Sequence, residues 1–456
     1  MALRFPAALR KHPVSTGAGM DMRNRSRRFV LLLACAAPPA LAAESPIPIA
    51  DARAVFAQAQ SLCETDGGRL WGASLCAPIM LVDPKTRRIV ASQADAKGAL
   101  RPQDGVFVGE LPPEANAANT ATEWSGTRWT QMLWPLPEDD SVRGTLIAHE
   151  LFHRLQPDLP IATAKGGENP HLDSLEGRYN LQLEWRALAK ALQADSRAAK
   201  RAAAADALSF RAERYRRFPE ARADEAALET NEGLAEYTGV MVGNGTPQTR
   251  SRAALNDLQA HVGDPSFVRS FAYATGPAYG MLLDDLAPGW RKRLGDVPAD
   301  LGTRLRDAAR IEVPTGEAAL AAAAARYDGA ALRATETVRE QQRLAQLARN
   351  RARFVDGPVL TLALVHMSVQ FNPSNLQPLD GVGTVYPTMR VTDDWGTLEV
   401  ADGAVMRSDW KAVILAAPDN TGTAPQGPGW TLTLKPGWML APGERTGDYV
   451  LKGPGS

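Results

Sequence analysis

The chain has few histidines, no excess charge of either sign and no long apolar run. Only 6 of the 456 residues are histidine, so a regularly spaced pair of histidines is unlikely to arise by chance. Lys plus Arg and Asp plus Glu both number 51, which leaves no basic excess for nucleic acid or an anionic membrane. No apolar run reaches the roughly 18 residues of a membrane span, so we expect no transmembrane segment in the mature chain. The 45% hydrophobic content is ample for a sizeable core in two or three domains.

Residues 1–42 are expected to be a signal peptide. Arginines at positions 23–28 precede the apolar run FVLLLACAAPPALA, which ends in the small-residue cleavage site Ala40-Leu41-Ala42. Translation could start at Met20 or Met22, because the residues before them look like ordinary upstream sequence. Lipid attachment at Cys35, in the lipobox-like Leu-Leu-Ala-Cys, is the alternative to cleavage after Ala42. We therefore expect a periplasmic or secreted bacterial protein.

Cysteine is rarer still, with 3 residues in the chain, and removal of the signal peptide leaves Cys63 and Cys76. An even number in an exported chain predicts a disulfide that closes the loop SLCETDGGRLWGASLC. Free thiols are the alternative. A metal site at these cysteines is disfavoured, because no CxxC pair or nearby histidine accompanies them.

The composition changes along the chain in a way that predicts an α+β fold. Residues 43–140 form a β-rich lobe, with a hairpin around Asp83-Pro84-Lys85, and residues 141–354 form a helical lobe. Residues 355–456 are rich in Gly, Pro, Trp, Val and Thr and predict a small antiparallel β domain, sandwich-like, without recognisable chemistry. The run RWTQMLW at 128–134 is either a plain sheet strand or one on which extended substrates pair.

The strongest motif is His149-Glu150-Leu151-Phe152-His153, an HExxH pattern in a helix predicted over 141–157. Ser141 is the expected N-cap, and Pro157 ends the helix. Positions four apart lie on one helical face, so the imidazoles of His149 and His153 can bind one zinc ion. Glu150 is placed to accept a proton from water at that zinc.

A catalytic zinc keeps three protein ligands and one open position. A third histidine in HExxHxxGxxH is absent, because Arg-Leu-Gln-Pro follows His153, so a carboxylate is expected. Glu229, Glu232 and Glu236 share one side of a helix predicted near 224–242, and periodicity does not rank them. A solvated acidic stripe is the simpler interpretation of Glu229 and Glu236.

The order HELFH, NEGLAEY and YATGPAYG resembles that of the gluzincin metallopeptidases, in particular the aminopeptidase N-like and glycyl-aminopeptidase-like groups. The resemblance covers residues 130–290 and implies that Glu232 is the third zinc ligand and Glu150 the general base. It also implies that Tyr273, with Gly276 in a Tyr-x-x-Gly motif, stabilises the oxyanion. Without the resemblance, Tyr273 would equally be a core aromatic.

Two features depart from that family pattern. A long helical insertion separates His153 from Glu232, which leaves Glu176 and Glu184 as rival ligands. No GxMEN-like segment, which holds the free amino end of a substrate in aminopeptidase N-like enzymes, precedes the zinc helix, and this weakens the case for aminopeptidase activity.

The expected function is that of an exported zinc metallopeptidase that hydrolyses peptide or protein substrates. The alternative is an exported binding or assembly protein, in which the zinc site is structural or vestigial. The intact Glu150 favours the enzyme, because a purely structural site needs no base.

Overall fold

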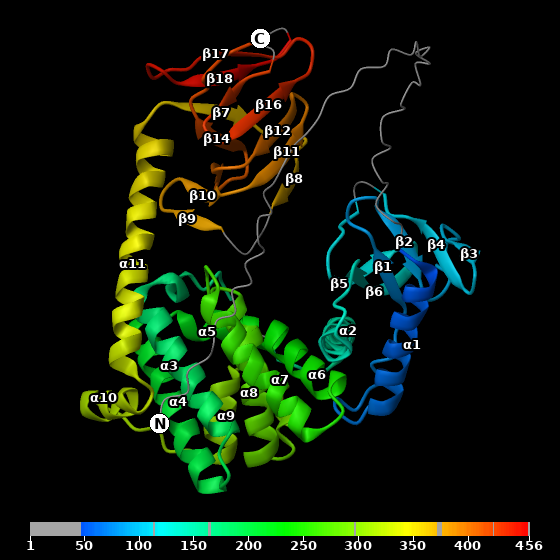
Figure 1. Cartoon of the computed structure of the whole chain (residues 1–456), viewed down its shortest axis with the longest axis vertical. Helices are drawn as coiled ribbons and strands as arrows, with labels where there is room; N and C mark the ends of the chain where they lie inside the picture. The colour runs from blue at the N-terminus through cyan, green and yellow to red at the C-terminus, as the bar shows by residue number, and fades with distance from the viewer. Residues whose placement is uncertain are drawn as a thin grey trace, which may run out of the picture. The chain divides into compact units, whose positions relative to one another are not determined.

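The computed structural model describes residues 47–112, 115–162, 166–295, 298–371, 376–422 and 424–454. The predicted signal peptide, with Cys35, lies outside these ranges. The described chain is an α+β protein, as predicted: along the chain, strands precede and follow a long helical region (Figure 1). No helix in the described ranges combines the length and the apolarity that crossing a bilayer requires.

The N-terminal part consists of one helix and a six-stranded sheet with the order β3-β4-β2-β1-β6-β5. The predicted hairpin is present, with Val82 paired to Ile89 across the turn at Asp83. Strand β6 pairs in parallel with β1 and antiparallel with β5, so it is an inner strand and β5 is an edge. The elements are α1 (Ile49–Asp66), β1 (Ile79–Val82), β2 (Arg88–Ala91), β3 (Arg101–Gln103), β4 (Val106–Glu110), β5 (Thr120–Trp124) and β6 (Thr127–Leu133).

The predicted disulfide is present and joins Cys63, in the last turns of α1, to Cys76. It ties the end of this helix to the segment that leads into β1.

The helical region begins with α2, and Glu232 lies in a π-helical segment between α5 and α6. The long helical insertion predicted between His153 and Glu232 includes the two long helices α3 and α4. The elements are α2 (Asp140–Leu155), α3 (Leu175–Leu192), α4 (Arg197–Arg217), α5 (Ala221–Leu228), a π-helical segment (Glu229–Gly233), α6 (Leu234–Gly243), α7 (Pro247–Ala260), α8 (Ser270–Leu286), α9 (Leu301–Ala309), α10 (Glu317–Arg326) and α11 (Gly329–Arg351).

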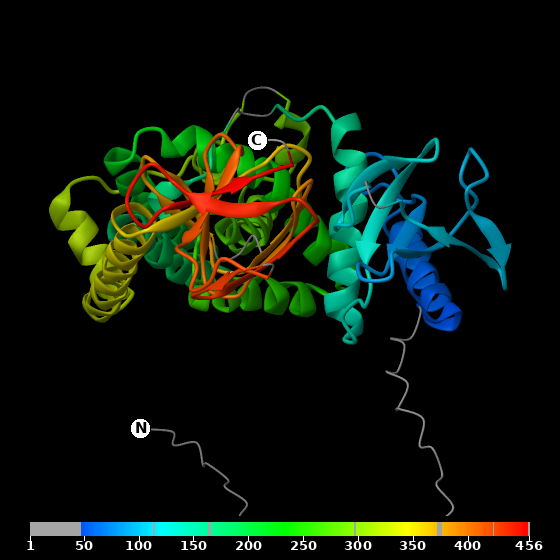
Figure 2. The same ribbon diagram turned by 90° about the horizontal axis from the view of Figure 1, so that it is seen from above.

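Helix α2 contacts strands β5 and β6 as well as helix α6, and Figure 2 shows it between the N-terminal sheet and the green helices that follow it in the chain. Its apolar side chains, Ile147, Leu151 and Phe152, are buried in a core to which strands β1 and β6 and helices α3, α6 and α8 also contribute. The two lobes expected at 43–140 and 141–354 therefore share one hydrophobic core. Helix α6 packs closely on α2 because it has glycine at the crossing: a Cβ on Gly239 would lie 2.6 Å from the Thr145 carbonyl oxygen.

The C-terminal part consists of a seven-stranded and a five-stranded sheet that share a buried core, in agreement with the predicted β sandwich. Its pairing is antiparallel, as expected, except that β18 pairs in parallel with β7. The strands are β7 (Val359–Ala363), β8 (Ser368–Phe371), β9 (Gln377–Leu379), β10 (Gly383–Tyr386), β11 (Met389–Asp393), β12 (Gly396–Val400), β13 (Ala404–Arg407), β14 (Ala412–Ala416), β15 (Gln426–Gly427), β16 (Trp430–Leu434), β17 (Met439–Pro442) and β18 (Tyr449–Lys452).

Candidate metal centre

Two imidazoles of α2 meet at one point because their residues are one helical turn apart. The Nε2 atoms of His149 and His153 lie 3.0 Å apart. The helix begins at Asp140, one residue earlier than expected, and its N-cap is Asp139, not Ser141. The Asp139 carboxylate accepts hydrogen bonds from the backbone N–H groups of Ser141 and Val142. The helix ends at Leu155, two residues before the proline that was predicted to stop it.

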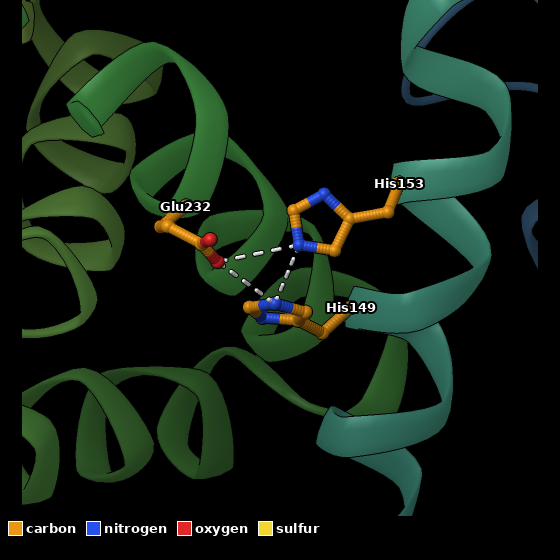
Figure 3. Close-up of side chains that lie close together, drawn as sticks. All are labelled: His149, His153 and Glu232. Carbon is orange, nitrogen blue, oxygen red and sulfur yellow. Dashed lines mark hydrogen bonds and ion pairs between the residues drawn. The ribbon is translucent and has the colours of Figure 1, made fainter. Parts of the chain in front are cut away.

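The third group is Glu232, which reaches the imidazoles from the π-helical segment. Its Oε2 atom lies 3.3 Å from His153 Nε2 and 3.5 Å from His149 Nε2. Figure 3 shows both imidazoles of α2 and this carboxylate pointing toward one another. A π turn is an uncommon element that occurs frequently at functional sites.

This set of atoms fits a metal cation. The Nδ1 atom of His149 lies 2.7 Å from Glu236 Oε2; a proton on Nδ1 would be donated to this carboxylate and would leave Nε2 as a lone-pair acceptor. That nitrogen faces a carboxylate oxygen and a second imidazole nitrogen, so electron-rich atoms converge on one point. His149, His153 and Glu232 thus form a largely buried group that could hold a metal ion.

The electrostatics of the group favour positive charge at this point. Burial alone would lower the pKa of His149, but hydrogen bonds with Glu232 and Glu236 raise the pKa to about 10. Burial opposes ionisation of Glu232 as well, yet its hydrogen bonds with the two histidines and Tyr273 hold its pKa well below the usual range. A metal cation would take the place of the proton that these carboxylates attract.

Neighbouring side chains fix the orientation of the three donors. Gln156 lies one turn after His153, and its Oε1 is 3.4 Å from His153 Nδ1 while its Nε2 donates to the Thr230 carbonyl oxygen. The second oxygen of Glu232 accepts weak hydrogen bonds from Asn231 and Arg269, at 3.2 and 3.4 Å. Sequence reasoning missed Gln156 and Arg269; the spacing of Gln156, three residues after a ligand on a helix, could have indicated it.

The interpretation of Glu229 and Glu236 as a solvated stripe is wrong. Glu236 contacts His149, as described above, because it lies one turn after Glu232 on the same helical face. Glu229 is 0% exposed and bound to Arg211. The carboxylates that periodicity placed together therefore have separate environments.

The rival ligands lie elsewhere. Glu176 pairs with Arg333 and Arg217. Glu184 is fully buried, but Arg211 and Arg214 bind its carboxylate at 2.7 Å. The structure therefore brings Glu232, and neither of these two residues, to the imidazoles.

Glu150 is 4% exposed and lies next to His149 in the chain. Its Oε2 atom is buried and has no hydrogen-bond partner among the described residues. Burial raises the pKa of this carboxyl group, against the attraction of the two nearby histidines. An unpaired buried carboxyl oxygen is costly, which suits a group that hydrogen-bonds a molecule at the site.

Tyr273 belongs to the site, and its neighbouring aromatics belong to the core. Its hydroxyl donates a 2.7 Å hydrogen bond to Glu232 Oε2, and its ring stacks on His149 at 5.6 Å. Phe271 and Tyr279 are fully buried instead. Burial, followed by the charge of Glu232, raises the pKa of the Tyr273 hydroxyl, which keeps it a donor.

A pocket of about 480 Å³ is lined by all three residues of this candidate metal-binding group. Its lining includes Glu150 and Tyr273, together with Asn119, Thr120 and Ala121 at the start of the edge strand β5. The predicted substrate strand at 128–134 is β6, which pairs on both sides, so an extended chain could not add to it. The strand beside the pocket with a free edge in the sheet is β5.

The site thus joins three convergent donor atoms, an unpaired buried carboxyl group and a tyrosine hydroxyl in one pocket. Comparison with protein-family models, curated proteins and solved structures found no match to the chain.

Proposed function

We propose that this protein is an exported, zinc-dependent hydrolase of peptide bonds, of the gluzincin type. The single observation that carries the proposal is the convergence of His149 Nε2, His153 Nε2 and Glu232 Oε2 beside the unpaired carboxyl group of Glu150. Two imidazoles and one carboxylate are a ligand set of catalytic zinc sites, which keep a fourth position open. The disulfide supports export, because disulfides persist in oxidising compartments.

The proposed ligands are His149, His153 and Glu232, with Glu236 and Gln156 holding the two imidazoles in place. When bound, zinc polarises a carbonyl oxygen and lowers the pKa of a water molecule toward neutrality. Glu150 accepts a proton from the attacking water and later passes it to the leaving amine nitrogen. Tyr273 turns its hydroxyl from Glu232 Oε2 to the oxyanion that develops on the substrate carbonyl.

The pocket and the number of ligands favour hydrolysis over a purely structural site. A structural zinc site is closed by four protein ligands, whereas the metal-binding group among the described residues has three. A structural site also gives no reason for a buried carboxyl group without a partner. The binding or assembly protein therefore stays the second candidate.

Metal analysis and hydrolysis of a peptide library test the proposal. We expect one zinc per chain and cleavage that a chelator abolishes. The variant Glu150→Gln should keep its zinc and lose activity by about a hundredfold or more. Glu110→Gln, an exposed glutamate on β4, is the matched control and should hydrolyse like the wild type.

Three outcomes would contradict the hydrolase. They are a purified chain without stoichiometric zinc, full activity in Glu150→Gln, and a zinc-loaded protein that turns over no peptide. The last result would favour the binding or assembly protein.

A further inference from the structure

A buried cluster of charged side chains includes Glu229, a near neighbour in the chain of the proposed third ligand, Glu232. Glu229 is in the same π-helical segment as Glu232, three residues earlier, and is fully buried. Its oxygens accept hydrogen bonds from Arg211 Nη1 at 2.9 Å and Nη2 at 2.5 Å. They also accept from the Thr275 hydroxyl at 2.8 Å and the Leu301 backbone N–H at 3.0 Å. Each oxygen of this carboxylate therefore has two donors.

Arg211 is itself held in place and gives Glu229 a fixed anchor. It is 2% exposed, and its guanidinium also binds Glu184 Oε1 and Asp300 Oδ1, both at 2.7 Å. Glu184 is bound in turn by Arg214 and by the Tyr279 hydroxyl. The hydrogen bonds of Arg211 and Glu184 thus join α3, α4, the start of α9 and the π-helical segment.

Thr275 connects Glu229 to α8, the helix that carries Tyr273. Its hydroxyl binds Glu229, and it is adjacent to Gly276, where α8 touches the π-helical segment. A Cβ on Gly276 would lie 2.2 Å from the Gly233 carbonyl oxygen, so the two backbones are in contact. The position of Tyr273 relative to Glu232 therefore depends on the same contacts that hold Glu229.

Glu229 and Glu232 point in different directions from one short segment. Glu229 points to Arg211 in the helical core, and Glu232 points to the imidazoles of α2 (Figure 3). Rotation of the segment about its axis would move both carboxylates together. Fixing the first therefore fixes the direction of the second.

We propose that Glu229, bound by Arg211 and Thr275, is a positioning residue that holds Glu232 at the metal site. The inference rests on the proposed zinc site. The competing interpretation is that the cluster only stabilises the fold, as buried ion pairs do when a partner is removed. The two interpretations differ in zinc affinity, because groups that orient a ligand typically change metal affinity 10–100-fold.

Zinc affinity, measured on folded protein by competition with a chromophoric chelator, separates them. Glu229→Gln keeps the shape and removes the charge, and we expect zinc binding about tenfold weaker. Thr275→Val removes one donor to Glu229 at nearly constant volume, and we expect a smaller loss of about threefold. Thr275→Val leaves the ion pairs intact. If Glu229→Gln does not fold, the zinc affinity of Thr275→Val therefore distinguishes the positioning role from a purely stabilising role.

Glu336→Gln is the matched control. Glu336 lies on α11, is 2% exposed, and binds two buried residues of α3, Arg178 at 2.8 Å and Gln182 at 2.6 Å. This variant should lose stability and keep zinc affinity within about twofold of wild type.

Wild-type affinity in both folded test variants, or an equal loss in the control, would overturn the positioning role. A wild-type protein that binds no zinc would overturn the proposed metal site and the positioning role together. Zinc binding without peptide turnover would refute only the hydrolase, because affinity is the quantity measured here.

Discussion

The Nδ1 atom of His149 lies 2.7 Å from Oε2 of Glu236, a residue of the same helix face as the proposed ligand Glu232. This contact turns the imidazole so that its other nitrogen faces His153 and Glu232. Carboxylates in this position fix the tautomer of a metal-binding histidine and raise its basicity. Glu236 is therefore expected to contribute to metal binding without touching the metal.

Glu236→Gln tests that role. The amide can still hydrogen-bond His149 but no longer carries a charge, so we expect zinc affinity to fall about 10–100-fold with the fold retained. Chelator competition measures the affinity, and circular dichroism checks the fold. The exposed Glu110→Gln serves as the control for loss of one acidic charge. Unchanged affinity in Glu236→Gln would show that the contact has no role in metal binding.

Gly276→Ala tests the contact between α8 and the π-helical segment. An added Cβ would lie 2.2–2.6 Å from backbone atoms of Gly233, and backbone cannot yield as a side chain can. We expect the free energy of unfolding to fall by about 1–3 kcal/mol. Hydrolytic activity should fall as well, because Tyr273 would move away from Glu232.

Gly245→Ala is the control for this substitution, since nothing lies within 4 Å of a Cβ at that position. Its free energy of unfolding should stay within about 0.5 kcal/mol of wild type. Urea unfolding measures both variants. Equal stability of Gly276→Ala and wild type would mean that the helices do not touch at this point.

Local patterns in the sequence predicted the histidine pair, and tertiary contacts decided the rest of the site. His149 and His153 share one helical face whatever surrounds them, so their spacing is sufficient. Glu232 is separated from them by α3 and α4, and only the family resemblance ranked it above Glu229 and Glu236. The structure distinguishes these carboxylates by their partners: Arg211 for Glu229 and His149 for Glu236.

The N-cap of α2 is another feature that the sequence predicts only in part. Asp139, Asp140 and Ser141 can all cap a helix, and their order does not say which one does. The choice of Asp139 follows from its extended backbone and from its two hydrogen bonds to the first turn. The fold class, in contrast, follows from composition, because the change from Ala/Arg/Glu-rich to Val/Thr/Gly-rich sequence is spread over many residues.

Reduction of the disulfide should destabilise the protein. The bond joins residues 13 apart. A crosslink over a loop of this length lowers the conformational entropy of the unfolded chain, which raises the free energy of unfolding by about 3 kcal/mol. Urea unfolding of the protein with and without dithiothreitol measures the loss. Reduced wild type is preferable to a serine variant, because Cys63 is buried and a hydroxyl there would add its own cost. Identical unfolding curves would contradict the prediction.

Asp95, in the N-terminal part of the chain, is expected to make the free energy of unfolding depend on pH. Its carboxylate accepts hydrogen bonds from the backbone N–H groups of Lys97, Ala99 and Leu100 and from the Ser125 hydroxyl. Burial alone would raise the pKa of Asp95, but the hydrogen bonds from the Ser125 hydroxyl and from the backbone N–H groups of Leu100 and Ala99 hold this pKa below the ordinary range. The charged carboxylate thus stabilises the loop that joins β2 to β3.

The sign of the effect follows from the lowered pKa. In the unfolded chain Asp95 titrates near pH 3.9, so its contribution is complete above that pH and is lost as the pH falls toward the lower folded value. Wild type should therefore exceed Asp95→Asn in free energy of unfolding at about pH 6, and this gap should narrow at about pH 3. Ser125→Ala, which removes one of the four donors, should show a smaller gap with the same trend. A gap that stays constant between the two pH values in urea unfolding would mean that the pKa of Asp95 is the same in the folded and unfolded chain.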